Sequence, residues 1–464
     1  MTTIDYDVIV VGAGGAGLSA AAAASTAGAA VLVVESEPRT GGSTALSGGV
    51  FYAAGTSLQR EAGIEDPGPD DQYRYYMTLN QYRLEAALVR RLCDDAPDAF
   101  EWLRALGCAF HATDLYAAGV DKIPRGHRAA GGGAAIVEAI QGSLQGVDIA
   151  TATRVERLLV EDGRVSGIVV DGAPVRAAAV ILATGGFGAN PGLLAELYPD
   201  AARHGDAHWY IGAPGSRGDG LVMGREAGAG VDGLNKGLLL LSPGFAKDLE
   251  SYLPSWLMHV TPAGRRFVDE AIEYSVLAGL LRDQPGGVCF ALFDEERRTA
   301  ARTSAYRPAP NWTADRLAEF ADKGLLARAD TIAGLADAIG VSADALETAV
   351  ARYNAMADAG ADADFFKSAD LLHPIRRAPF YAATLRAAIV CWTGTGLRID
   401  VEAHVLDEAG RAIPGLYAAG ETTGGMFGDC YASGGASIAN AVIFGRVAGR
   451  NAAADAAAVT ERTA

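Results

Sequence analysis

The chain has 464 residues, of which half are hydrophobic and a fifth are charged, a composition typical of globular proteins with a sizeable buried core. This length is about three times the ~150-residue prior for one domain, so we expect two or more structural units. The 39 basic and 56 acidic residues give a formal net charge of −17. That charge disfavours nucleic acids and anionic membranes as partners, because both require a basic surface.

Cysteine spacing and the start of the chain narrow the class of protein further. None of the five cysteines forms a C-x-x-C pair, so neither a metal site nor a disulfide framework is expected. The first residues, MTTIDYDVIVV, lack the basic residues that open a secretory signal. The Ala-rich stretch 18–34 is interrupted by Ser25, Thr26 and Gly28, which predicts a helix and a short strand rather than a membrane span. We therefore expect a cytoplasmic protein.

The first motif in chain order predicts a dinucleotide-binding unit. The apolar run Asp7–Val11 predicts a buried parallel strand, and the glycine-rich segment 12–17 (GAGGAG) follows at once. A helix-forming run then reaches Gly28, and Val31–Val34 predicts a second strand that ends at Glu35. This order of strand, glycines, helix, strand and acidic residue is more specific than a glycine motif alone.

Each part of this motif has a physical task. Gly12 permits the sharp turn, Gly14 lets backbone N–H groups approach a pyrophosphate, and Gly17 allows close packing of helix and sheet. The helix N-terminus adds a partial positive charge for the phosphates. Glu35 is placed to accept hydrogen bonds from the ribose hydroxyls.

Three further segments carry a resemblance that implies FAD as the dinucleotide. These are the glycine-rich stretch 38–49, the run 180–186 (VILATGG) and the run 415–421 (GLYAAGE). Together with the first motif they resemble the fumarate reductase/succinate dehydrogenase flavoprotein superfamily. The resemblance implies an α/β fold: a Rossmann-like FAD-binding domain of the two-dinucleotide-binding-domain type, interrupted by an α+β cap domain that receives the substrate.

The resemblance also implies a set of FAD-binding residues and a non-covalent cofactor, because Gly42 occupies the slot of the histidine that carries covalent flavin in succinate dehydrogenase. The implied FAD-binding residues are Gly12, Gly14, Gly15, Ala16, Gly17, Glu35, Ser36, Gly42, Ser43, Thr44, Leu46, Ser47, Gly48, Gly49, Val155, Ala183, Thr184, Gly185, Asn190, Asp219, Gly220, Gly420, Glu421, Ser437 and Ile438.

The predicted organisation is an FAD-binding domain in two parts, 1–231 and 379–464, with the cap formed by 232–378. The stretch 147–180 alternates and turns at Asp162-Gly163 and Asp171-Gly172, which predicts an antiparallel meander. Within the cap, the sequence predicts polar helices at 314–323, 332–339 and 343–357.

Two positions argue against fumarate or succinate as substrate. In fumarate-reducing members of the superfamily an arginine eight residues after the arginine of an Arg-Phe-x-x-Glu motif delivers a proton. Here the motif begins at Arg266, and the corresponding residue is Tyr274. Ala432 stands where those members place a second arginine that clamps the dicarboxylate. Desolvating carboxylates without a cation costs several kcal/mol per ion.

The residues found instead resemble the catalytic set of 3-ketosteroid dehydrogenases, above all the Δ4-(5α)-type. They are Tyr274 in the cap with Tyr431 and Ser433 near the final Gly-Gly pair, and the segments 41–52 and 124–127 also resemble that group. The helix that begins after Gly435 (ASIANA) departs from it and is closer to the general superfamily.

The expected function is an FAD-dependent dehydrogenase (desaturase) that introduces a C=C bond α,β to the carbonyl of a cyclic ketone, with 3-ketosteroids first. Tyr274 would take the α-proton, and flavin N5 would accept the hydride. Tyr431, Ser433 and the Gly435 N–H would stabilise the developing enolate. The expected partners are the ketone and an unidentified electron acceptor.

Two alternatives stay open. One is desaturation of a smaller cyclic ketone, such as 4-oxocyclohexanecarboxylate or cyclohexanone, because Arg125, Arg128 and Arg398 could meet a carboxylate. The other is an enone or enoate reductase that runs in the opposite direction.

Overall fold

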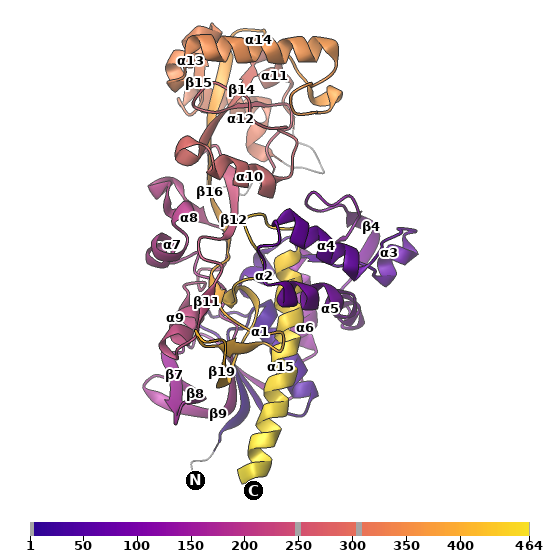
Figure 1. Cartoon of the computed structure of the whole chain (residues 1–464), viewed down its shortest axis with the longest axis vertical. Coiled ribbons are helices and arrows are strands. Elements are labelled where there is room, and N and C mark those ends of the chain that lie inside the picture. Colours follow the sequence, from indigo (N-terminus) through magenta and orange to yellow (C-terminus); the bar gives the residue numbers. More distant parts are fainter. Residues whose placement is uncertain (1–3, 246–251, 303–308, 464) are drawn as a thin grey trace. The chain divides into compact units, whose positions relative to one another are not determined.

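The computed structural model describes residues 4–245, 252–302 and 309–463, and Figure 1 shows their helices and strands. The chain divides into two compact units. The first unit comprises Met1–Pro199, Gly212–Leu238 and Cys391–Ala464, and the second comprises Asp200–Ile211 and Leu239–Val390. None of the described helices is both long and apolar enough to cross a membrane.

The first unit is built on a largely parallel sheet with the order β18-β19-β9-β1-β2-β6. Its strands are β1 (Tyr6–Val11), β2 (Val31–Val34), β6 (Val147–Ala150), β9 (Ala173–Leu182), β18 (His404–Leu406) and β19 (Ala412–Ala418). Both neighbours of β1 are parallel to it, with Val8 opposite Val31 on one side and Ala179 on the other. These strands are apolar at nearly every position because helices cover a parallel sheet. The predicted α/β fold is confirmed.

Two helices pack closely beside this sheet, α1 (Gly15–Thr26) and the C-terminal α15 (Ala436–Thr463), the long yellow helix in Figure 1. Small residues permit their approach. A Cβ on Gly445 would lie 2.3 Å from the Ala16 carbonyl oxygen, and one on Gly449 would lie 2.1 Å from that of Ala20. The Ala-rich composition of α1 is therefore a packing requirement as well as a helix signal.

The predicted meander is correct in part. β7 (Arg157–Glu161), β8 (Arg164–Val170) and β9 form consecutive antiparallel pairs, so both predicted Asp-Gly turns are confirmed. The first part of the stretch is wrong, because β6 pairs in parallel with β2 and belongs to the main sheet.

The first unit also contains a second, smaller sheet and several further helices. A three-stranded sheet has the order β3-β5-β4. The elements are α2 (Gly42–Leu46), β3 (Val50–Tyr52), α3 (Ser57–Glu61), α4 (Pro69–Leu79), α5 (Ala86–Ala105), β4 (Phe110–Tyr116), β5 (Gly126–Ala129), α6 (Gly132–Gly142), α7 (Pro191–Leu197), α9 (Asp219–Glu226), β11 (Val231–Asp232) and β17 (Gly396–Leu397).

The second unit is an α+β unit with a sheet centred on one long strand. The order is β10-β16-β14-β13, with β12 and β15 also paired to β16. The strands are β10 (Trp209–Tyr210), β12 (Gly237–Ser242), β13 (Met258–Val260), β14 (Val288–Asp294), β15 (Ala327–Ala329) and β16 (Phe380–Thr393). The helices include α8 (Pro199–Ala202), α10 (Tyr274–Arg282), α11 (Glu295–Ala300), α12 (Ala314–Asp322), α13 (Ile332–Ile339) and α14 (Ala343–Ala359), which confirms the three predicted polar helices.

Candidate active site

The first glycine turn has the geometry that its sequence predicts. Gly12 adopts a φ of +104°, and a Cβ on Gly17 would lie 1.8 Å from the Gly12 carbonyl oxygen, so only glycine fits there. The buried Glu35 carboxylate accepts the Ala13 N–H at 2.7 Å and the Glu37 N–H at 2.9 Å. Glu35 thus secures the turn after β1 as well as standing at the end of β2.

The second glycine-rich segment lies against this turn and leaves an open cradle. The Gly41 N–H donates to the Ala13 carbonyl at 2.8 Å. A Cβ on Gly14 would meet nothing closer than 3.9 Å, and one on Gly48 would meet nothing within 4 Å. Bare backbone facing free space beside a helix N-terminus fits the pyrophosphate of FAD.

The later predicted segments also come together in the first unit. The Thr184 hydroxyl accepts the Gly220 N–H at 3.0 Å, and Thr422 donates to the Gly185 carbonyl at 3.1 Å. Thr393 next to them donates to Glu421 from its N–H at 2.9 Å and its hydroxyl at 2.8 Å. Burial raises the pKa of Glu421 to about 7 despite these donors. These turns converge because β9 and β19 are adjacent parallel strands.

Several predicted FAD-binding side chains have partners within the protein. Asn190 caps α7 by accepting the Gly192 and Leu193 N–H groups, and Asp219 pairs with Arg154. The Ser43 hydroxyl accepts the Ala213 N–H at 2.9 Å, and that of Ser47 donates to the Thr44 carbonyl at 2.7 Å. Ser36 donates to Glu35 at 3.2 Å, the Gly15 N–H donates to Thr44 at 3.2 Å, and Val155 and Ile438 are buried. Their part in FAD binding remains a prediction.

Tyr431 and Ser433 lie in the loop that precedes α15. The buried Tyr431 hydroxyl donates to Ser437 Oγ and accepts the Ser437 N–H, both at 2.8 Å. Burial raises the pKa of Tyr431 above its usual range, although both contacts with Ser437 act the other way. Ser433 is 1% exposed, and its hydroxyl lies close enough to the buried Tyr76 hydroxyl to act on the pKa of Tyr76. Gly435 has a φ of +98°, and a Cβ there would lie 2.7 Å from the Val50 carbonyl oxygen.

Three aromatic rings, those of Phe427, Trp392 and Tyr76, cluster near Tyr431, and none of them is among the predicted site residues. The ring centroid of Phe427 lies 5.5 Å from that of Tyr431, 5.1 Å from that of Trp392 and 6.4 Å from that of Tyr76. The Tyr76 hydroxyl is buried beside Ser433, and burial raises its pKa although the contact with Ser433 acts the other way. In the sequence, the cluster Tyr73-Arg74-Tyr75-Tyr76 was the one signal that could have predicted an aromatic side chain at this place.

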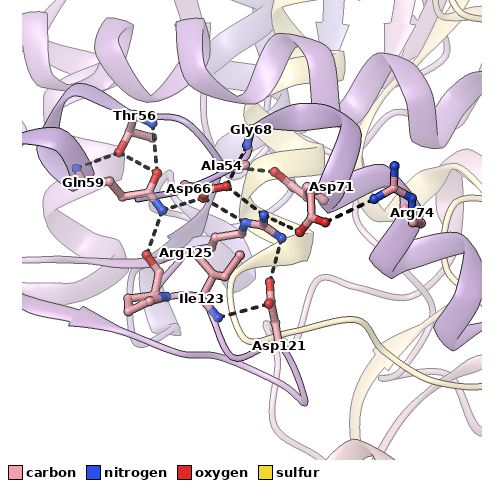
Figure 2. A network of polar contacts seen from close by, with 12 residues as sticks. Ala54, Thr56, Gln59, Asp66, Gly68, Asp71, Arg74, Asp121, Ile123 and Arg125 are labelled. Atoms are coloured by element: carbon pink, nitrogen blue, oxygen red, sulfur yellow. Dashed lines mark hydrogen bonds and ion pairs between the residues drawn. The ribbon is translucent and has the colours of Figure 1, made fainter. Parts of the chain in front are cut away.

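The arginines that were offered to a substrate carboxylate have other roles. Arg125 is fully buried and pairs with Asp66 at 2.7 Å, Asp71 at 2.9 Å and Asp121 at 2.8 Å, as Figure 2 shows. The prediction is therefore wrong for Arg125. Arg398 contacts both carboxylate oxygens of Asp232, and Arg128 lies over the ring of Tyr116 at 5.4 Å.

Tyr274 begins helix α10 in the second unit and lines a pocket there. The pocket residues are Leu241, Tyr252, Leu253, Glu270, Ile272, Tyr274 and Leu277. The rings of Tyr252 and Tyr274 meet edge to face at 5.5 Å. The Arg266 guanidinium contacts both oxygens of Glu270 at 2.9 Å.

Glu270 is ionised in spite of its burial. Lys367 Nζ lies 3.0 Å from Glu270 Oε2, and both side chains are 0% exposed. Burial alone would raise the pKa of Glu270, but the hydrogen bond from Arg266 and the charge of Lys367 outweigh it and hold that pKa below its usual value. No cluster of His, Cys, Asp and Glu among the described residues is arranged to hold a metal ion.

Known proteins similar to this chain agree with these features. A family model described as FAD binding domain matches residues 7–438. A fumarate reductase (cytochrome) from Shewanella frigidimarina is 32% identical, covering 96% of this chain and 77% of that protein. A vinyl phenol reductase from Lactiplantibacillus plantarum is 30% identical, covering 97% and 96%. The structure of 3-ketosteroid Δ4-(5α)-dehydrogenase from Rhodococcus jostii RHA1 in complex with 4-androstene-3,17-dione is 27% identical, with a TM-score of 0.81 and 98% of both chains covered.

The fold, the cradle and these similarities define a flavoprotein, and the protein is an FAD-dependent oxidoreductase. The chain belongs to the FAD binding domain family. The predicted membership of the fumarate reductase/succinate dehydrogenase flavoprotein superfamily and the predicted cofactor FAD are confirmed.

Proposed function

We propose that this oxidoreductase is a dehydrogenase (desaturase) that introduces a C=C bond α,β to the carbonyl of a cyclic ketone, with 3-ketosteroids as the first substrate class. The observation that carries the proposal is the loop before α15. It offers the buried hydroxyls of Tyr431 and Ser433 on either side of Ala432, which stands where the fumarate-reducing members place an arginine. A neutral carbonyl oxygen suits hydroxyl donors, whereas a carboxylate would stay desolvated and unpaired.

Tyr431 acts in this proposal as a donor rather than a base. Since burial raises its pKa, the hydroxyl keeps its proton across the physiological range. To serve a substrate, Tyr431 must redirect this proton from Ser437 Oγ to the ketone oxygen, while the Ser437 N–H continues to hold the phenol oxygen. Ser433 Oγ supplies a second buried donor, next to the hydroxyl of Tyr76.

Tyr274 takes the α-proton in this proposal. As the first residue of α10 it stands at the positive end of the helix dipole, which favours a phenolate by about 0.3–1 kcal/mol. That is less than one pKa unit, so the helix alone does not make a phenol a strong base. Most of the required driving force must come from the substrate, whose α C–H is acidified when Tyr431 polarises the carbonyl. FAD, when bound, supplies the two-electron redox chemistry.

A second candidate is a reductase of an activated C=C bond, because the fumarate and vinyl phenol reductases above are 32% and 30% identical to this chain. A carboxylate substrate is disfavoured for either direction. Lys236, a cation that reaches the loop before α15, lies 2.5 Å from Asp429, whereas the side chain of Arg83 lies 4.0 Å from the same carboxylate and is 70% exposed. Arg125 is likewise occupied.

The direction and the substrate class are tested by one anaerobic titration. We expect 5α-androstanedione to bleach the oxidised flavin, and 4-oxocyclohexanecarboxylate to leave it yellow. Bleaching by the carboxylate alone would favour the smaller ketone. If neither ketone bleaches the flavin and an enone or a vinyl phenol reoxidises the reduced protein, the proposed dehydrogenase function is wrong and the reductase takes its place.

A further inference from the structure

We propose that Tyr75 of helix α4 and Asn80, the C-cap of that helix, are positioning residues that hold Tyr431 and Ser433 in their working geometry. This inference rests on the proposed function for the identity of the reaction. Its physical content is a clamp within the first unit. The residues on both sides of Tyr431 are fixed by side chains that lie 350 or more positions earlier in the chain.

Asn80 binds the backbone on one side of Tyr431. Its amide nitrogen donates to the Cys430 carbonyl at 3.0 Å, and its amide oxygen accepts the Cys430 N–H at 3.1 Å. The side chain thus satisfies both backbone groups of one residue, as a neighbouring strand would do. Asn80 is 5% exposed, and a Cβ on Gly428 would lie 2.5 Å from its amide oxygen, so the loop passes directly over the amide.

Tyr75 binds the backbone on the other side. Its hydroxyl donates to the Ala432 carbonyl at 2.5 Å. Gly119 also leaves no space here, since a Cβ at that position would lie 2.3 Å from the Ala432 oxygen and 2.7 Å from the Tyr75 hydroxyl. Three hydrogen bonds therefore define the path of the chain through residues 430 to 432, and the direction of the Tyr431 ring follows from that path.

The buried Arg125 gives this clamp a rigid base (Figure 2). Its guanidinium contacts Asp71 in the first turn of α4 and both oxygens of Asp66. Asp66 in turn accepts the N–H of Gly68, the residue that precedes α4, at 2.8 Å. Burial opposes ionisation of Asp66, but the hydrogen bond from Arg125 holds its pKa below the usual value. The ion network fixes the start of α4, and the helix carries Tyr75 and its C-cap Asn80 to the loop.

A clamp of this kind matters because a donor works only at hydrogen-bond distance from the oxygen it stabilises. Displacements of about 1 Å in catalytic groups cost on the order of 10²-fold in rate. Tyr75 and Asn80 would therefore change turnover without touching substrate, and they would do so through Tyr431 and Ser433.

The test uses the FAD-loaded protein with Asn80→Ala, Tyr75→Phe and the matched control Tyr73→Phe, which changes a tyrosine of the same helix whose ring contacts Arg90 instead. We expect roughly 10- to 100-fold lower kcat for the first two variants with little change in KM or FAD content, and wild-type kcat for Tyr73→Phe. In a Tyr431→Phe background, Asn80→Ala should lower kcat by a much smaller factor than it does in the wild type. The reason is that Asn80 acts by positioning the Tyr431 hydroxyl, which this background lacks. Fully multiplicative losses would overturn the proposal.

Amide hydrogen exchange keeps this test independent of the substrate. The Cys430 amide should exchange at least about 10-fold faster in Asn80→Ala than in the wild type, and at the wild-type rate in Tyr73→Phe. Unchanged exchange in Asn80→Ala would overturn the clamp even if turnover fell. If the wild type desaturates no ketone, the proposed function fails, and the exchange rates still decide whether the clamp exists. Should Asn80→Ala not fold, Tyr75→Phe keeps the ring, and wild-type kcat in that variant would overturn the role of Tyr75.

Discussion

Tyr431 and Ser437 show what a sequence can and cannot supply at the scale of single residues. The motif places a tyrosine just before the Gly-Gly pair, and that part of the candidate site follows from the sequence. Ser437 is a predicted FAD-binding residue, and that role stays a prediction; the structure adds that its hydroxyl and its N–H both contact the Tyr431 hydroxyl. Side-chain partners of this kind depend on the path of the loop, which motif spacing does not encode. The same holds for Arg125, whose three aspartates lie at 66, 71 and 121.

The roles of the two tyrosines can be separated by proton exchange at the substrate α-carbon. Tyr274→Phe should stop this exchange when the flavin is already reduced, because only proton transfer is then measured. Tyr431→Phe should slow both exchange and turnover by about 10²-fold or more, the usual effect of removing an oxyanion donor. NMR of the ketone in D₂O measures the exchange. Wild-type exchange in Tyr274→Phe would remove that residue from the mechanism.

Glu35 provides a second prediction for a single residue. Glu35→Ala should weaken FAD retention, because the ribose loses its expected acceptor and the Ala13 N–H loses its partner at 2.7 Å. Glu37→Ala is the matched control, since the bond that Glu37 makes to Glu35 comes from its backbone. Flavin content after extensive dialysis is the measurement. Equal retention in both variants would contradict the role of Glu35.

At the scale of helices and strands, the sequence predicted an element correctly where hydrophobic periodicity, turn residues and segment length agreed. The strand before the first glycines, the helix ending near Gly28 and the Asp-Gly turns are examples. Residues 147–150 were misplaced because β6 has a parallel partner, β2, more than 100 positions earlier. A short apolar run does not reveal whether its partner is local. The helix α2 within the glycine-rich stretch also went unassigned, since Gly41 and Gly42 mask its start.

The glycine-rich segment gives a prediction that separates cofactor binding from folding. A Cβ on Gly48 would meet no protein atom within 4 Å. Gly48→Ala should therefore leave the stability of the apoprotein nearly unchanged but raise the dissociation constant of FAD, if FAD occupies that space. Gly142→Ala, equally open and at the end of α6, is the control. Titration of apoprotein with FAD checks this, and equal affinities in both variants would exclude Gly48 from the cradle.

At the scale of the whole molecule, the first unit contains the motifs that predict FAD binding, whereas the second unit contains few recognisable motifs. The second unit takes in residues 200–211 because β10 pairs with β16, and no signal in the sequence joins those segments. That this unit serves as the cap for substrate remains a prediction. It contains the buried ion network of Arg266, Glu270 and Lys367. His259 is buried beside this network, and both of its ring nitrogens lack hydrogen-bond partners among the described residues.

His259 makes the stability of the protein depend on pH in a defined direction. Burial, reinforced by Lys367 and Arg266, lowers the pKa of His259 to about 4, although Glu270 opposes this. The unfolded chain therefore binds the proton more readily than the folded chain between pH 6.5 and about 4. The stabilising contribution is complete above pH 6.5 and is lost as the pH falls, by roughly 3 kcal/mol over the whole window.

His259→Leu should remove this contribution, so its free energy of unfolding should fall less between pH 7 and pH 5 than that of the wild type. Urea unfolding followed by tryptophan fluorescence measures the difference, with the exposed His111→Leu as the control. Parallel pH profiles for wild type and His259→Leu would show that His259 is not the titrating group.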